Sequence, residues 1–191
     1  MLEVIRIDFF IEIICVFAVG CSSGWLLEVI FRRFWSGNNT ERRWVNPGFL
    51  KGPWLPVYGC GLSIMYTFCK LLFPLMPSGI IFTALGIFTL LALLIETEYL
   101  AGIISKRVLH ASLWDYSEEW GNIDGIICPK FSLFWGILCA VYYFFIHSPL
   151  DRAVVSLSKS PMLLIAVGAY LGAFFIDSFF SVKSAIFTEK S

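Results

Sequence analysis

The stretch NPGFLKGPWLPVYGCG, residues 46–61, separates two long apolar segments of the chain. Its three prolines each remove a backbone donor, and its four glycines allow conformations closed to other residues, so it cannot begin as a regular helix. Its apolar side chains, among them Phe49, Leu50 and Trp54, do not suit a solvated linker. The sequence therefore predicts a structured break between two helices.

The segments around this break belong to a chain that is 58% hydrophobic, 17% aromatic and only 15% charged. This composition is far more apolar than that of typical soluble proteins. Five stretches are long enough to cross a hydrocarbon core of about 30 Å, which needs about 20 helical residues, and lipid requires them to be helical. The fold class predicted is all-α: a polytopic membrane helix bundle of one domain, residues 1–191, with helices at residues 9–31, 53–73, 79–100, 131–148 and 161–181.

Basic residues predict the orientation, because lysine and arginine collect on the cytoplasmic side. Only Arg6, Lys70, Arg152 and Lys159 fall on the opposite side. The N-terminus is therefore expected outside the cell membrane and the C-terminus in the cytoplasm, with both long connections, 32–52 and 101–130, facing inward. The residues on the cytoplasmic side are Arg32, Arg33, Arg42, Arg43, Lys51, Lys106, Arg107, Lys130, Lys183 and Lys190.

Charge and motifs exclude several functions. The formal net charge is zero and no basic stripe is present, which argues against a nucleic-acid partner. The six cysteines form no C-x-x-C pair, so they indicate small apolar fillers, with no metal site and no cofactor. The chain has no G-x-x-x-x-G-K-[ST] motif, so any ATP-driven role would need a partner subunit.

Within spanning segments ionisable groups are costly and usually face a bundle interior, a watery cavity or one another. Glu96 and Glu98 point in roughly opposite directions on a helix, so we expect one of them to be structural. Neither has a nearby histidine or cysteine, which makes a zinc site improbable. The four acids near the cytoplasmic ends of predicted helices are Glu28, Glu96, Glu98 and Asp177.

Glu28 lies between two residues on the same helical face. Arg32, one turn later, can pair with it, and Gly24, one turn earlier, allows another helix to approach closely. Two interpretations remain open: an interfacial ion pair that ends the helix, or a residue that lines a site.

A second irregular block, WDYSEEWGNIDGIICPKFSLFWG, residues 114–136, resembles the first in character. His110, Asp115 and Ser117 lie close in sequence, but nothing marks Ser117 as a strained nucleophile, so we expect polar loop contacts rather than a triad. His147 is expected at an interface.

Non-helical backbone at membrane depth is tolerated only where protein buries it or where it lines a watery cavity. We therefore expect the first loop to dip into the interface or to fold back over helix ends, or else to form an interfacial turn anchored by Trp54. Two structured loops that meet four acidic helix ends predict a polar pocket facing the cytoplasm. Its candidate residues are Glu28, Arg32, Asn46, Lys51, Tyr58, Glu96, Asp115, Tyr116, Ser117, Asn122 and Asp177.

Three blocks, GWLLE, NPGFLKGPWLPVYGCG and WDYS…GNIDGIICPKFSLFWG, resemble the recurrent blocks of a bacterial family labelled putative ABC-transporter type IV, or CmpB-like. The resemblance covers residues 24–136 and implies a permease-like protein of the bacterial inner membrane. The resemblance implies neither a particular substrate nor any catalytic residue. The family-like positions are Glu28, Asn46, Gly48, Gly52, Pro53, Pro56, Tyr58, Gly59, Trp114, Asp115, Tyr116, Ser117, Asn122 and Gly125.

Three functions stay open, and a non-enzymatic one is favoured. The first is a transporter permease in contact with membrane lipid that works with an ATPase subunit or as a homo-oligomer. The second is an enzyme acting on lipid at the inner leaflet, with Glu28 or Asp115 as general base and Arg42, Arg43 or Lys51 holding an anionic headgroup. The third is a scaffold that binds other helices through the small residues Gly168 and Gly172.

Overall fold

The computed structural model describes residues 2–36, 39–110 and 112–188, and within these ranges the chain is helical with no strand. Two π-helical turns, η1 (Phe68–Leu72) and η3 (Tyr142–Ile146), and a 3-10 turn, η2 (Phe73–Leu75), interrupt the α-helices. The α-helices are α1 (Leu2–Phe34), α2 (Pro56–Thr67), α3 (Ile80–Val108), α4 (Pro129–Val141), α5 (His147–Leu157) and α6 (Pro161–Thr188).

The described chain contains five helical segments long and apolar enough to cross a membrane, which confirms the predicted fold class. Three of these segments begin with a proline, whose fixed φ and missing N–H suit the first position of a helix. The five are Ile7–Phe34, Pro56–Leu75, Ile80–Val108, Pro129–Leu157 and Pro161–Ile186.

Most boundaries differ from those predicted, among them both ends of the first helix and the end of the last, and three of the differences have a clear local cause. The second segment begins at Pro56 instead of residue 53, because Pro53 lies in the preceding turn. The third continues to Val108 instead of residue 100, since residues 101–108 contain no proline and end on basic side chains, which favour a helix C-terminus. The fourth continues as α5 through the predicted connection after residue 148, because Pro149 falls in the first turn of α5, where proline is tolerated.

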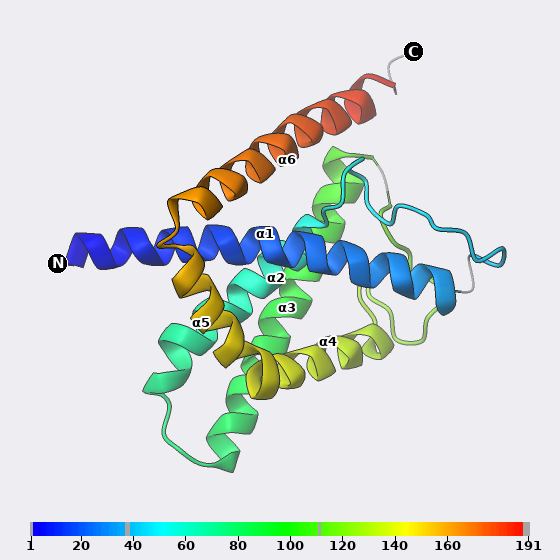
Figure 1. Ribbon diagram of the computed structural model, residues 1–191. Coiled ribbons are helices and arrows are strands. Elements are labelled where there is room, and N and C mark those ends of the chain that lie inside the picture. The colour runs from blue at the N-terminus through cyan, green and yellow to red at the C-terminus, as the bar shows by residue number, and fades with distance from the viewer. Residues whose placement is uncertain (1, 37–38, 111, 189–191) are drawn as a thin grey trace.

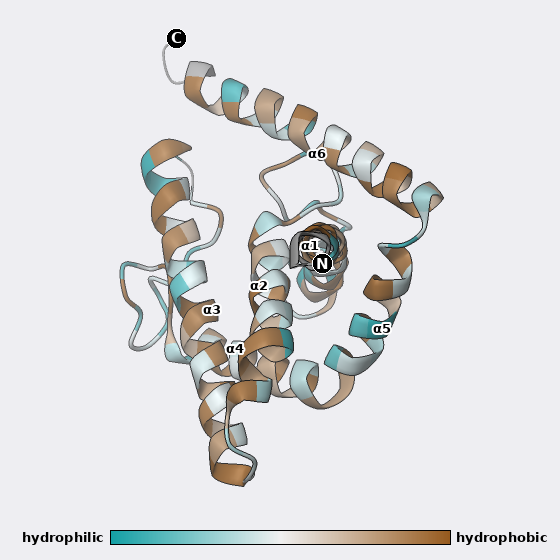
Figure 2. Cartoon of the chain, turned by 90° about the vertical axis from the view of Figure 1, so that its left-hand side faces the viewer, coloured by the Kyte–Doolittle hydropathy of each residue, from teal (hydrophilic) through white to brown (hydrophobic). Residues whose placement is uncertain are grey.

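Helix α1 is the central element (Figure 1). Helices α2, α5 and α6 all contact it, and α3 packs against α2 and α4. A view along α1 shows α6, α2 and α5 on different sides of it (Figure 2). Three faces of α1 therefore each contact a different helix.

The core consists of three clusters placed along these contacts. One joins α2 and η1 to α3 and α4 through Leu90, Leu94 and Cys139. A second surrounds Val16 and Tyr66, and the third packs the loop after α1 onto α6. Five of the six cysteines are buried and all six are free thiols, which confirms the prediction of apolar fillers at every position except the exposed Cys60.

Glycines set the distance between α1 and α2. A Cβ added at Gly24 would lie 2.3 Å from both Cβ and Cγ of Tyr58, and one at Gly59 would lie 2.5 Å from the Sγ of Cys21. This confirms the close helix approach predicted at Gly24. At Gly168 and Gly172, by contrast, an added Cβ has no described atom within 4 Å.

Gly24→Ala should separate α1 from α2, because one of the atoms it meets, the Tyr58 Cβ, is bonded directly to the α2 backbone and cannot rotate away. We expect a destabilisation of about 1–3 kcal/mol, the usual cost of overpacking. Unfolding of the purified protein in mixed micelles of increasing SDS content, followed by circular dichroism, measures it.

Gly136→Ala is the matched control, since its added Cβ would be 3.5 Å from Leu91, an ordinary contact. Equal midpoints for the two variants would contradict a close contact at Gly24.

Candidate functional site

Glu28 on α1 is bonded to a second helix as well as to its own. The hydroxyl of Tyr58 on α2 donates to Glu28 Oε1 at 3.1 Å, and Arg32 Nε donates to Glu28 Oε2 at 3.4 Å. Tyr58 is held between Gly24 and the ring of Trp135, whose centroid lies 5.4 Å from its own. Glu28 therefore does more than end a helix with an ion pair.

Glu98 on α3 is buried, with 5% of its surface exposed. Its Oε2 accepts a hydrogen bond from Trp135 Nε1 at 2.9 Å, and its Oε1 accepts one from the Tyr116 hydroxyl at 3.3 Å. The Tyr116 ring stacks on Phe131 with 4.4 Å between centroids and an 11° angle between planes. Both donors to Glu98 are neutral side chains.

Trp135 links the two carboxylates, because it contacts Tyr58 and donates to Glu98. We call the set Glu28, Tyr58, Glu98, Tyr116 and Trp135 the acid–aromatic cluster. Burial, and then the charges of Glu98 and Glu28, raise the pKa of Tyr116 above its usual value, so its hydroxyl stays a donor near neutral pH. The cluster joins α1, α2, α3, α4 and the second loop.

Of the two α3 acids, Glu96 is the one among the candidate pocket residues, whereas Glu98 is the one in the acid–aromatic cluster. Glu96 is exposed and lines a separate hollow of about 380 Å³ between α2 and α3, together with Ser63 and Thr97. The opposite directions expected for Glu96 and Glu98 are confirmed, but only the position of α4 and its Trp135 decides which one is enclosed. The Trp135 side chain was not singled out, although it lies within the third family-like block.

Asn46 organises the first loop. Its Oδ1 accepts hydrogen bonds from Trp25 Nε1 on α1 at 2.8 Å and from the Gly48 N–H at 3.2 Å. Its Nδ2 donates to the carbonyl oxygens of Leu50 and Lys51 at 2.8 and 3.2 Å. The bond from Trp25 holds the loop against α1, and the other three hold the loop to itself. The Lys51 side chain is exposed.

Asp177 on α6 fixes the turn before α2. Its Oδ2 accepts hydrogen bonds from the Gly52 N–H and from Trp54 Nε1, each at 2.8 Å. The Trp54 ring meets Tyr170 edge-on at 5.3 Å, and the N–H of Leu55 donates to the Cys21 carbonyl of α1 at 3.0 Å. The first loop thus folds back over the helices, one of the arrangements expected from its sequence.

The polar residues of the second loop hold that loop together. Asp115 Oδ1 accepts from the Ser117 N–H at 2.9 Å, a bond that holds the pKa of Asp115 below its usual value. Asn122 Nδ2 donates to the carbonyl oxygens of Ser117 and Glu119 at 3.0 and 2.9 Å. Gly125, with a φ of +64°, donates its N–H to Asn122 Oδ1 at 3.1 Å. These are the loop contacts expected in place of a triad.

The structure therefore divides the eleven candidate residues into three groups. It brings Glu28, Arg32, Tyr58 and Tyr116 together, and it leaves Lys51 and Glu96 exposed elsewhere. The remaining five hold the loops: Asn46, Asp115, Ser117, Asn122 and Asp177.

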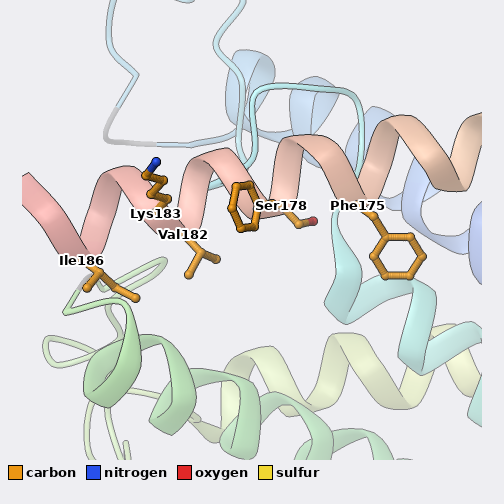
Figure 3. A pocket seen from close by; sticks show the side chains of 6 residues that line it. Phe175, Ser178, Val182, Lys183 and Ile186 are labelled. Atoms are coloured by element: carbon orange, nitrogen blue, oxygen red, sulfur yellow. The ribbon is translucent and has the colours of Figure 1, made fainter.

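A larger hollow, of about 690 Å³, lies along one face of α6 (Figure 3). It is almost wholly apolar, with Lys183 and Ser178 at its polar positions, and it includes no member of the acid–aromatic cluster. Among the described residues no group of three or more histidine, cysteine, aspartate or glutamate side chains could hold a metal ion.

Five apolar spanning helices around buried polar groups define a multi-pass membrane protein. A family model described as "Putative ABC-transporter type IV" matches residues 15–182, so the chain belongs to this family of ABC-transporter-type membrane proteins. The match extends beyond the three sequence blocks on both sides. Comparison with curated proteins and with solved structures gives no match.

Asp177→Ala should free the turn before α2, because it removes the acceptor for Gly52 and Trp54. Hydrogen bonds to charged groups contribute about 1.5–3 kcal/mol to stability, and a difference of about 1.4 kcal/mol changes an equilibrium constant tenfold. We expect trypsin to cleave after Lys51 at least about tenfold faster in the purified variant, as followed by mass spectrometry.

Ser178→Ala is the control, since the Ser178 hydroxyl bonds only to the Phe174 carbonyl of its own helix in the described contacts. Unchanged cleavage in Asp177→Ala would show that the turn is held without Asp177.

Proposed function

We propose that this protein is the permease subunit of a transporter and that the acid–aromatic cluster is its substrate-binding site. The single observation that supports this is the enclosure of Glu98 of α3, near Glu28 of α1, among aromatic side chains from α2, α4 and the second loop. Ionisable groups inside spanning segments are rare and usually serve substrate or ion pathways. The family supports a transport role.

The chemistry of the cluster favours a positively charged substrate. Glu98 receives only the neutral donors Trp135 and Tyr116, so its negative charge has no opposite charge among the contacts described for it. Aromatic faces attract cations, and a desolvated contact of this kind contributes about 2 kcal/mol. A small organic cation would pair with Glu98 and contact the rings of Tyr58 and Trp135.

Access to this site would come from the end of α1 that carries Glu28 and Arg32. Their side chains are 25% and 33% exposed, whereas Glu98 is enclosed. Movement of Arg32 away from Glu28 would open the cluster, because the pair is long at 3.4 Å and confined to one helix. Pairs of this kind at i and i+4 contribute only about 0.3–0.5 kcal/mol.

The proposed site faces the cytoplasm. The support is the unequal distribution of lysine and arginine between the two sides, which favours an N-terminus outside and a C-terminus inside. Trypsin should then cleave after Lys51 in inverted membrane vesicles and leave this bond uncut in intact cells. The reverse result would place the cluster on the outer side.

Glu98→Gln should weaken binding of small organic cations at least about tenfold, because the amide keeps the shape of the carboxylate and loses its charge. Thermal shifts of the detergent-solubilised protein measure this, with tetramethylammonium as the simplest probe. Glu96→Gln is the matched control, two residues away on the same helix. Equal shifts in both variants, or no shift with any cation, would exclude this substrate class.

The permease role also requires an ATPase partner, since the chain has no phosphate-binding loop of its own. Affinity purification from membranes in mild detergent should recover an ATPase subunit in a fixed ratio, identified by mass spectrometry. Recovery of the chain with an enriched lipid and no ATPase would instead support the lipid-acting enzyme.

A second copy of the chain would contact the first through Gly168 and Gly172. Gly168→Ile should therefore abolish any homo-oligomer.

A further inference from the structure

A second polar cluster lies on α1 far from the first. Glu12 precedes Glu28 by sixteen residues, which is about 24 Å along a helix. Around Glu12 the structure gathers Tyr66 of α2, Lys70 of η1 and Asp151 of α5. We call these four residues the Lys70 cluster. In the sequence, Lys70 is only one of the four basic residues expected on the outer side, and no pattern connects it with Asp151.

Lys70 is at the centre of this cluster. Its Nζ donates to Glu12 Oε2 at 2.6 Å, to Asp151 Oδ1 at 2.9 Å and to the Tyr66 hydroxyl oxygen at 2.9 Å. An ammonium group has three hydrogens, so all of them are used. One positive charge therefore faces two carboxyl groups.

The Tyr66 hydroxyl has too few hydrogens for the contacts that its oxygen makes with the two carboxyl groups. Its oxygen lies 2.9 Å from Glu12 Oε2 and 2.8 Å from Asp151 Oδ1, both hydrogen-bond distances. A hydroxyl has one hydrogen and can donate to only one of the two. If both carboxyl groups were ionised, the other contact would bring two oxygens together with no hydrogen between them. One added proton on either carboxyl group completes the set, because that group then donates to the Tyr66 oxygen.

Among the side chains that the structure describes, the neighbouring groups supply no second positive charge in contact. The His147 ring lies 6.1 Å from the Tyr66 ring, faces Asp151 and Lys70, and shares a hydrogen bond of 3.1 Å with the Tyr142 hydroxyl through Nδ1. From α1 the neighbour is the thiol of Cys15. Helix α6 contributes the apolar side chains of Leu164 and Val167.

The cluster is closed on one side and open on the other. The Glu12 side chain is 8% exposed, whereas those of Lys70 and Asp151 are 26% and 34% exposed. A π-helical turn carries Lys70, and another ends just before His147. Single π turns within helices occur often at functional sites, where they change the direction of side chains.

We propose that the Lys70 cluster is a proton-binding site in which Glu12 and Asp151 share one exchangeable proton through the Tyr66 hydroxyl. The proton comes from water on the side of Asp151 and Lys70, adds to a carboxylate oxygen, and returns to water by the same route. Two coupled carboxyl groups bind such a proton as a pair rather than singly. Because Asp151 belongs to α5, release of the proton leaves two carboxylates repelling each other and weakens the contact between α5 and α1.

Infrared spectroscopy of the full chain in phosphatidylcholine nanodiscs tests this directly. At neutral pH and without sodium, the wild type should show a protonated carboxyl band that shifts in D₂O. Glu12→Gln and Asp151→Asn should each abolish the same band, because the remaining carboxylate then pairs with Lys70 alone. Glu119→Gln is the matched control: Glu119 also contacts a lysine, Lys130, at 2.6 Å, but there one positive charge faces one negative charge. It should leave the band intact.

Three results would overturn the proposal. Loss of the band in only one of the two amide variants would assign the proton to a single residue and not to a pair. Disappearance of the wild-type band when sodium is added at constant pH would identify a cation site instead. Absence of any exchangeable protonated carboxyl band in the wild type would exclude the shared proton even if neither variant folds.

Discussion

The close contact between α1 and α2 is the interaction on which both polar clusters depend. Glycines at this contact leave no room for a Cβ, so the two backbones approach closely. On either side of the contact, a glutamate of α1 accepts a hydrogen bond from a tyrosine of α2: Glu28 from Tyr58, and Glu12 from Tyr66. At this short separation a tyrosine hydroxyl of α2 reaches a carboxylate of α1. The same packing therefore stabilises the bundle and positions its buried acids.

The two clusters stabilise a buried carboxylate in different ways. In the acid–aromatic cluster Glu98 has neutral donors and aromatic neighbours, an arrangement that leaves its charge available to a ligand. In the Lys70 cluster one ammonium serves two carboxyl groups, an arrangement that leaves a hydrogen bond incomplete. Burial of a charge is costly unless it is compensated, so each arrangement indicates what would complete it: a cation in the first, a proton in the second.

The two loops explain why many polar residues of the sequence lie outside both clusters. Irregular backbone that is buried in a membrane protein needs partners for its N–H and carbonyl groups, since lipid supplies none. Asn46 and Asp177 satisfy the first loop, and Asp115 and Asn122 satisfy the second. A polar residue in such a loop is thus as readily a structural partner as a ligand, and its sequence context is the same in either role.

The sequence by itself determined the number of spanning helices, the break at residues 46–55, the close approach at Gly24 and the family-like blocks. These depend on local properties: the length of an apolar run, the positions of proline and glycine, and the spacing of neighbours on one helix. Only the tertiary structure decided that Glu98 is enclosed and Glu96 is not, that helix continues beyond Pro149, and that Glu12 meets Lys70 and Asp151. These outcomes depend on which helix packs on which face, and residues as far apart as Glu12 and Asp151 share no local pattern that would reveal their contact.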